Sequence, residues 1–162
     1  MAISTGDKLP EATLYRMGDN GPEGVALSDF TKGRKVVLFA LPGAYTGPCT
    51  TAHVPSFVRT AKQFFDKGVD AIICIAANDP FVMKAWGEFT GAEAAGLTFL
   101  GDPGSEFILA TGRYFNAPPA GLLNRSNRYS LYAEDGVIKV INAEEDSGQC
   151  DISAGEKLLE KI

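Results

Sequence analysis

The chain carries three cysteines and one histidine, and Cys49 stands where a nucleophile could work. An apolar, strand-like run ends at a turn-forming segment, 42–48, and Cys49 follows directly. Such a turn delivers Cys49 to the start of the next helix, where free backbone N–H groups and the helix dipole favour an anion. Because polar turn residues surround Cys49, we interpret it as a reactive thiolate rather than a structural core cysteine.

Two neighbours of Cys49 restrict its chemistry. Thr46 lies three residues earlier, so its hydroxyl can bond the thiolate or a substrate oxygen, or serve only in the turn. The residues after Cys49 are Thr50, Thr51 and Ala52, so the Cys-x-x-Cys pair of a dithiol oxidoreductase is absent. The pattern therefore favours a nucleophile that works without an adjacent second thiol.

His53, the only histidine, follows Cys49 by four residues. A general base for Cys49 is one interpretation; a helix-face histidine with a single hydrogen bond is the favoured one. Together with Cys74 and Cys150, Cys49 and His53 could supply four zinc ligands. No paired Cys-x₂-Cys spacing supports such a centre, so we expect neither a metal nor another cofactor.

The composition indicates one globular domain over residues 1–162, with 45% hydrophobic and 22% charged residues. The net charge of −5 argues against a nucleic-acid partner. The longest apolar runs, 36–41 and 71–77, are too short to cross a membrane, which excludes a membrane partner. The N-terminus lacks the basic start and apolar stretch of a signal peptide, so the expected location is cytoplasmic.

Hydrophobic patterns predict the elements that position Cys49. Apolar runs at 35–41 and 70–77 are typical of strands buried on both faces, and 97–100 predicts a third strand. A helix is expected from about 48 to 67, in which Pro55 causes a kink or starts a new segment. The next helix has Asp79 as N-cap and Pro80 at its first position. Its inward side chains should be Phe81, Val82, Ala85, Trp86 and Phe89.

The second half of the chain adds a hairpin and two helices. Asp135-Gly136 between the runs 129–133 and 137–141 is a strong hairpin signal. A short helix is expected at 105–111, and a capping box from Ser153 to Glu156 predicts a last helix at 157–162. An N-terminal hairpin can pair 13–17 with 25–27. Together these elements predict an α/β, thioredoxin-like fold with a central mixed sheet flanked by helices.

The segment Pro42-x-x-x-Thr46-x-x-Cys49 resembles the active-site motif of peroxiredoxins. The whole stretch 42–57, with its His-x-Pro-x-Phe continuation, resembles the type-II, peroxiredoxin-5-like group. Segments 78–86 and 120–132 extend the resemblance over nearly the whole chain. Two departures are Tyr45, where phenylalanine is usual, and Gly47-Pro48, where the proline has moved by one place.

The resemblance implies a thiol peroxidase that reduces hydrogen peroxide and organic hydroperoxides through a sulfenic acid on Cys49. It implies that Thr46 positions the peroxide, that Pro42 shields the thiolate from water, and that Arg128 stabilises the thiolate and the transition state. Arg125 is the competing candidate for the arginine's role.

The reduction of the sulfenic acid leaves three alternatives open. No internal partner is needed if glutathione with glutaredoxin, or thioredoxin, supplies the thiol. Cys74 has the spacing of the resolving cysteine in plant type-II members but lies in an apolar strand. Cys150 lies in a polar segment, displaced by about two residues from the position of the resolving cysteine in animal peroxiredoxin 5.

Two further expectations come from the resemblance. The chain should form a homodimer through loops around the active site, with Tyr45, Phe81 and Trp86 as contacts; core packing is the alternative role of Phe81 and Trp86. A second function from the same thiolate is a peroxide sensor or redox relay, which passes the oxidation to a partner thiol.

Overall fold

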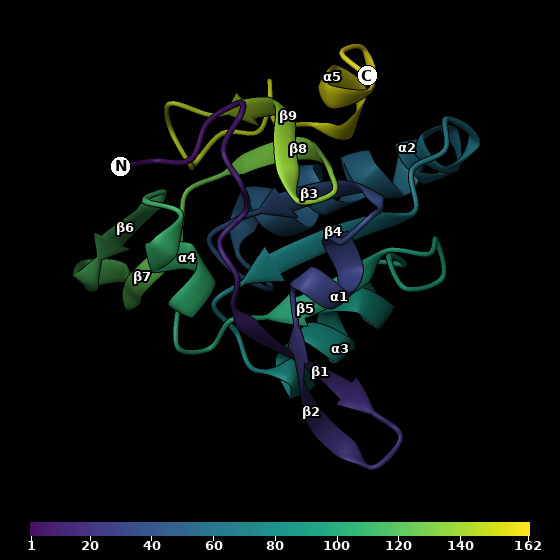
Figure 1. Cartoon of the computed structure of the whole chain (residues 1–162). Helices are drawn as coiled ribbons and strands as arrows, with labels where there is room; N and C mark the ends of the chain where they lie inside the picture. Colours follow the sequence, from purple (N-terminus) through teal and green to yellow (C-terminus); the bar gives the residue numbers. More distant parts are fainter.

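The computed structural model describes all residues from 1 to 162. A seven-stranded mixed sheet lies at its centre, in the order β2-β1-β5-β4-β3-β8-β9 (Figure 1). β3, β4 and β5 run parallel, whereas β8 and β9 and the hairpin β1–β2 pair in antiparallel fashion. The seven strands are β1 Thr13–Gly18, β2 Gly21–Ala26, β3 Lys35–Ala40, β4 Ala71–Ala76, β5 Thr98–Gly101, β8 Tyr129–Glu134 and β9 Val137–Ala143.

Helices cover both faces of this sheet, as the sequence predicts. α2, α3 and α5 pack on one face and α1 and α4 on the other. None of them has the length and apolar character needed to cross a bilayer. Their bounds are α1 Ser28–Thr31, α2 Val54–Asp66, α3 Pro80–Phe89, α4 Glu106–Ala110 and α5 Gly155–Leu159.

The sheet divides the core into two layers because side chains alternate along each buried strand. In β3, Val37 and Phe39 face α2 and α3, whereas Val36 and Leu38 face α1 and α4. Cys74 in β4 belongs to the α2–α3 layer, the same layer that contains Cys49. The two continuous apolar runs of the sequence are therefore strands buried on both faces, as predicted.

Several local predictions are confirmed. Asp79 caps α3 by accepting a hydrogen bond from the Val82 N–H at 3.0 Å. Asp135 and Gly136 both have positive φ, 49° and 76°, which the two-residue hairpin turn between β8 and β9 requires. The N-terminal hairpin forms as β1 and β2, with a shorter turn than the apolar pattern suggested. Short-range signals of this kind are reliable because the residues that form them are adjacent.

Two predictions about helices are wrong. Phe81 and Phe89 of α3 are 62% and 69% exposed, and Ala85 is exposed too. Trp86 is buried as predicted, together with Pro80, Met83 and Gly87. Gly87 faces inward because it lets α3 approach Phe99 closely. Apolar side chains on α3 thus occupy two faces, which the sequence pattern alone does not separate.

The capping box predicted before the last helix is also absent. Ser153 is buried and donates its hydroxyl to Glu144, while Glu156 pairs with Arg59. Ala154 is the N-cap of α5, without a side-chain cap. The sequence also gave no signal for a small separate sheet of β6 (Tyr114–Ala117) and β7 (Leu122–Ser126), joined by a 3₁₀ turn at Pro118–Ala120.

Candidate active site

Cys49 opens a wide helical turn between β3 and α2. The residues Cys49–His53 form a π turn, in which the Val54 N–H donates to the Cys49 carbonyl five residues back. α2 then begins at Val54, with Pro55 in its first turn, where a missing N–H costs nothing. Pro55 therefore starts a new helical segment, one of the two outcomes predicted for it.

A buried guanidinium faces the Cys49 sulfur. Arg128 Nη2 lies 3.1 Å from Cys49 Sγ, although the two residues are 79 positions apart in the chain. Cys49 is fully buried and Arg128 is 1% exposed. An arginine is charged at any accessible pH, so the sulfur of Cys49 receives a hydrogen bond from a cationic donor. Arg125, the competing candidate, donates to the Pro42 carbonyl instead.

The remaining donors of Arg128 are partly committed. Nε donates to the Ser147 carbonyl at 3.1 Å, and Nη1 is bonded to His53 Nδ1 at 2.9 Å. A guanidinium has about five N–H donors, so the three bonds to Cys49, His53 and Ser147 leave about two for a substrate. The Arg128 backbone N–H also donates to Ser147 Oγ at 3.1 Å. Arg128 is thus fixed by the segment that contains Ser147.

His53 is fully buried and contacts Arg128, and no group of three or more His, Cys, Asp or Glu side chains could hold a metal ion. Burial lowers its pKa well below the usual value, and the adjacent Arg128 charge lowers it further. The imidazole is therefore neutral in the folded protein near neutral pH. Its contacts are to Arg128 and to the Ser153 carbonyl, so the zinc-site interpretation has no geometric support.

Thr46 and Pro42 lie at the opening above Cys49. The Thr46 hydroxyl donates to the Gly43 carbonyl at 2.7 Å, which leaves its lone pairs free to accept a hydrogen bond. Pro42 is held by Arg125 Nη1, which donates to its carbonyl at 2.9 Å. Gly43 has no room for a side chain, because a Cβ atom there would meet the Arg125 guanidinium and Asn78.

An active-site cleft of about 480 Å³ leads to these groups. Its lining includes the apolar side chains of Phe115 and Leu122, from the small β6–β7 sheet, and the acidic residues Glu145 and Asp146. Pro42, Thr46 and Arg128 contribute to the lining. The cleft therefore joins three of the residues predicted from the sequence, and the β6–β7 sheet and the segment 145–148 are contributors that the sequence analysis missed.

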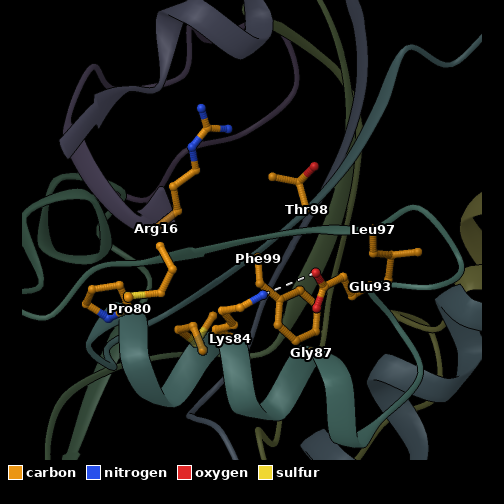
Figure 2. A pocket seen from close by; sticks show the side chains of 10 residues that line it. Arg16, Pro80, Lys84, Gly87, Glu93, Leu97, Thr98 and Phe99 are labelled. Carbon is orange, nitrogen blue, oxygen red and sulfur yellow. Dashed lines mark hydrogen bonds and ion pairs between the residues drawn. The ribbon is translucent and has the colours of Figure 1, made fainter. Parts of the chain in front are cut away.

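A second hollow, of about 210 Å³, lies between α3 and β5 with Arg16 of β1 at its edge (Figure 2). This α3–β5 hollow contains none of the predicted site residues. Its two cations are already paired, Arg16 with Glu23 at 2.8 Å and Lys84 with both Glu88 and Glu93. We therefore place the chemistry at the active-site cleft.

Comparison with known proteins identifies the family of the chain. The model of the redoxin family matches residues 4–159. Peroxiredoxin-2E-2, chloroplastic, of Oryza sativa is 43% identical over 99% of this chain and 72% of its own length. The structure of reduced Prx3 from Vibrio vulnificus in complex with hydrogen peroxide has a TM-score of 0.91 at 37% identity, covering 98% of each chain.

The chain is a peroxiredoxin of the type-II, peroxiredoxin-5-like group. Its fold is the thioredoxin-like fold of that family, as predicted. It is accordingly a thiol-dependent peroxidase with an antioxidant function, which takes a peroxide as substrate and a thiol as reductant.

The prediction of a cytoplasmic location is wrong. Besides the chloroplastic rice protein, the mitochondrial peroxiredoxin-2F of Arabidopsis thaliana is 43% identical over 84% of this chain and 67% of its own length. Relatives this similar belong to organelles, so the features of the N-terminus that we used do not identify the compartment.

The other two cysteines of this peroxiredoxin lie in different settings. Cys74 is fully buried between β3 and β5, and burial raises its pKa well above the usual thiol value, with the Cys49 charge as a smaller cause. Cys150 is half-buried in the segment after β9, and burial raises its pKa too. Neither forms a disulfide with Cys49 in this structure.

Proposed function

We propose that Cys49 is the peroxide-attacking thiolate of this peroxiredoxin and that Arg128, Thr46 and Pro42 prepare its site. The observation that carries the proposal is the 3.1 Å contact between the buried Arg128 guanidinium and Cys49 Sγ. A charged donor in a dry site stabilises both the thiolate and the negative charge that develops on peroxide oxygens during attack.

The proposed reaction is a displacement at oxygen. The Cys49 thiolate attacks the nearer oxygen of the hydroperoxide, a sulfur–oxygen bond forms, and the O–O bond breaks. Sulfur loses two electrons and becomes a sulfenic acid, while the leaving hydroxide or alkoxide takes up a proton. Thr46 accepts the O–H of the peroxide, because its own hydroxyl proton is committed to Gly43. Free Arg128 N–H groups donate to the oxygens.

The cleft favours hydrogen peroxide and small organic hydroperoxides as substrates. Pro42 and Thr46 line the opening, and Phe115 and Leu122 offer an apolar wall for an alkyl group. Pro42 is itself buried, so it keeps water from one side of the site. An alkyl hydroperoxide would place its polar end at Thr46 and Arg128.

An external thiol recycles the enzyme in this proposal, with glutathione and glutaredoxin as the first candidates and thioredoxin as the next. Cys74 is held by strand pairing on both sides, so it cannot approach Cys49 without breaking the sheet. Cys150 is more accessible, but its raised pKa leaves little thiolate near neutral pH.

Thiol counting tests the reaction and the recycling together. Pre-reduced wild type receives one equivalent of hydrogen peroxide, and free thiols and the intact mass are then measured. Loss of one thiol with gain of one oxygen supports the external-thiol route. Loss of two thiols and two hydrogens indicates an internal disulfide instead, and Cys74→Ala and Cys150→Ser then identify the partner. Cys49→Ser must lose the fast reaction, or the attacking residue is a different one.

A steady-state assay separates the enzyme from a sensor. Glutathione with glutaredoxin, or thioredoxin with its reductase, is added with excess peroxide to catalytic amounts of the protein. Many turnovers per protein support the peroxidase. A single oxidation with no recycling by any of these thiols supports the redox-relay alternative.

We further propose a homodimer that covers an exposed apolar stripe on α3. Phe81, Ala85 and Phe89 recur at four-residue intervals on its solvent face, and the Tyr45 ring lies 5.6 Å from that of Phe89. Trp86 is fully buried in the core, so its predicted role as a contact is withdrawn. Sedimentation should give a dimer for the wild type and a monomer for Phe81→Lys/Phe89→Lys; Leu123→Lys, on another exposed face, is the matched control.

A further inference from the structure

We infer that His53 is a positioning residue for Arg128: its neutral imidazole accepts a guanidinium N–H at Nδ1 and holds the cation against Cys49 without neutralising it. The inference rests on the proposed role of Arg128 at Cys49. It assigns a function to a side chain that neither attacks the peroxide nor contacts it.

The hydrogen bonds fix the tautomer of His53. Arginine has donors and no acceptor, so the 2.9 Å contact from Arg128 Nη1 requires that Nδ1 carry no proton. The other ring nitrogen, Nε2, lies 3.1 Å from the Ser153 carbonyl, which can only accept. A neutral imidazole with its proton on Nε2 satisfies both contacts at once, and no other protonation state does.

The packing fixes the direction of the ring. The imidazole packs against the stacked rings of Phe39 and Phe57, with ring centroids 5.0 and 5.7 Å away, and is fully buried. The Ser153 carbonyl holds its far side. A ring held in this way cannot rotate to follow Arg128, so it defines where the Arg128 Nη1 atom must lie. Nη2, on the same guanidinium plane, then meets Cys49 Sγ.

The absence of charge on this partner matters for catalysis. Arg16 and Arg59 each face a glutamate, Glu23 and Glu156, at 2.8 and 2.7 Å. Arg128 has only the His53 nitrogen, the Ser147 carbonyl and the Cys49 sulfur as side-chain partners. A carboxylate in place of His53 would share the positive charge and repel the thiolate. His53 holds the guanidinium as a carboxylate would, but it does not neutralise the positive charge of Arg128, which then acts fully on the Cys49 sulfur.

Two polar substitutions test the hydrogen bonds of the two ring nitrogens one at a time. Asn places its side-chain oxygen near the position of Nδ1, so His53→Asn keeps the acceptor for Arg128 and loses the bond to Ser153. His53→Gln reaches the position of Nε2, so it keeps the bond to Ser153 and loses the acceptor. Both are made in a Cys74→Ala/Cys150→Ser background, in which Cys49 is the only thiol, and thermal melts confirm that each folds.

The readouts are the rate constant for the first oxidation by hydrogen peroxide and the ultraviolet absorbance of the thiolate as a function of pH. His53→Asn should keep the rate within about threefold, whereas His53→Gln should lose about tenfold or more, since a hydrogen bond to a charged group is lost. In His53→Gln the thiolate absorbance should appear at higher pH than in His53→Asn. Equal behaviour of the two variants in both readouts, or a larger loss in His53→Asn, overturns the inference.

A spectroscopic measurement tests the same point without a substitution at His53. Because His53 is the only histidine, ¹⁵N-labelled histidine gives one pair of ring signals. We expect a neutral imidazole with the proton on Nε2 in the reduced wild type at neutral pH, and a shifted Nδ1 signal in Arg128→Met. A protonated ring, the opposite tautomer or an Nδ1 signal unchanged in Arg128→Met overturns the inference. These signals do not depend on turnover, so they remain decisive even where the proposed role of Arg128 in catalysis fails.

Discussion

The active-site cleft and the α3–β5 hollow are both lined by cations, but the cations differ in what they face. In the α3–β5 hollow, Arg16 and Lys84 are exposed and paired with glutamates; Figure 2 shows the pair of Lys84 with Glu93. In the active-site cleft, Arg128 is buried and its partners are a sulfur, a neutral ring and a carbonyl. Exposed ion pairs contribute little free energy and leave little field for a ligand. The electric field of a buried cation that has no carboxylate partner remains available to stabilise an anion that forms beside it.

The strongest test of this contrast replaces one cation in each hollow with methionine. The larger effect is expected at Arg128. Arg128→Met removes the charge and the donors at Cys49 and keeps an unbranched side chain. The rate constant with hydrogen peroxide should fall at least about a hundredfold, as for loss of a preorganised donor. Stopped-flow oxidation of the reduced enzyme measures it. A loss below about threefold would mean that the helix start alone activates Cys49.

The burial of His53 predicts a pH-dependent stability that exposed pairs do not give. Its pKa is lowered in the folded state by burial first and by Arg128 second, so below about pH 6.5 the unfolded chain binds a proton that the folded protein does not. As the pH is lowered, the free energy of unfolding of the wild type should therefore fall by up to about 1.4 kcal/mol per pH unit more than that of His53→Asn. Denaturant unfolding at pH 6.5 and 5.5 compares the two slopes. The ionisable group in contact with His53 is Arg128. Equal slopes would show that the imidazole is already charged or accessible.

The acidic residues that line the active-site cleft, Glu145 and Asp146, should affect charged substrates more than neutral ones. Neither Glu145 nor Asp146 takes part in an ion pair. Glu145→Gln/Asp146→Asn should raise the rate with a hydroperoxide that carries a carboxylate about threefold, with little change for a neutral alkyl hydroperoxide. Added salt should reduce the difference. A parallel gain with both substrates would point to a change in the shape of the cleft instead.

The smallest effect is expected from the matching substitution in the α3–β5 hollow. Lys84→Met removes two exposed ion pairs, with Glu88 and Glu93, so stability should change by no more than about 0.5 kcal/mol. Peroxidase activity should be unchanged. Chemical denaturation and the stopped-flow assay used for Arg128→Met measure both quantities. A loss of activity here would mean that the α3–β5 hollow is coupled to Cys49.

The sequence predicted those parts of the site that are local in the chain. Pro42, Thr46 and Cys49 lie within one turn, and a turn between a buried strand and a helix has a readable pattern. Asp79 and the Asp135-Gly136 turn were predictable for the same reason. Neighbouring residues determine such features before any long-range packing occurs.

Contacts between distant segments were harder to predict. Arg125 and Arg128 are three positions apart, and only the path of β7 into β8 brings Arg128 to the sulfur and Arg125 to Pro42. The roles of Ser147 and of the small β6–β7 sheet depend on pairings across the chain that no local pattern encodes. His53 was visible as a lone histidine, but its partner lies 75 residues away.

The π turn at Cys49–His53 makes this site sensitive to chain length. A π turn contains one residue more than an α-helical turn closed at the same place. Each residue rotates an α-helix by about 100°, so deletion of Thr51 that restored a regular turn would swing the Cys49 sulfur away from Arg128. A substitution at Thr51, which is exposed, keeps the spacing and leaves the sulfur in place. Insertions and deletions in these five residues should therefore be far rarer among active relatives than changes of residue type.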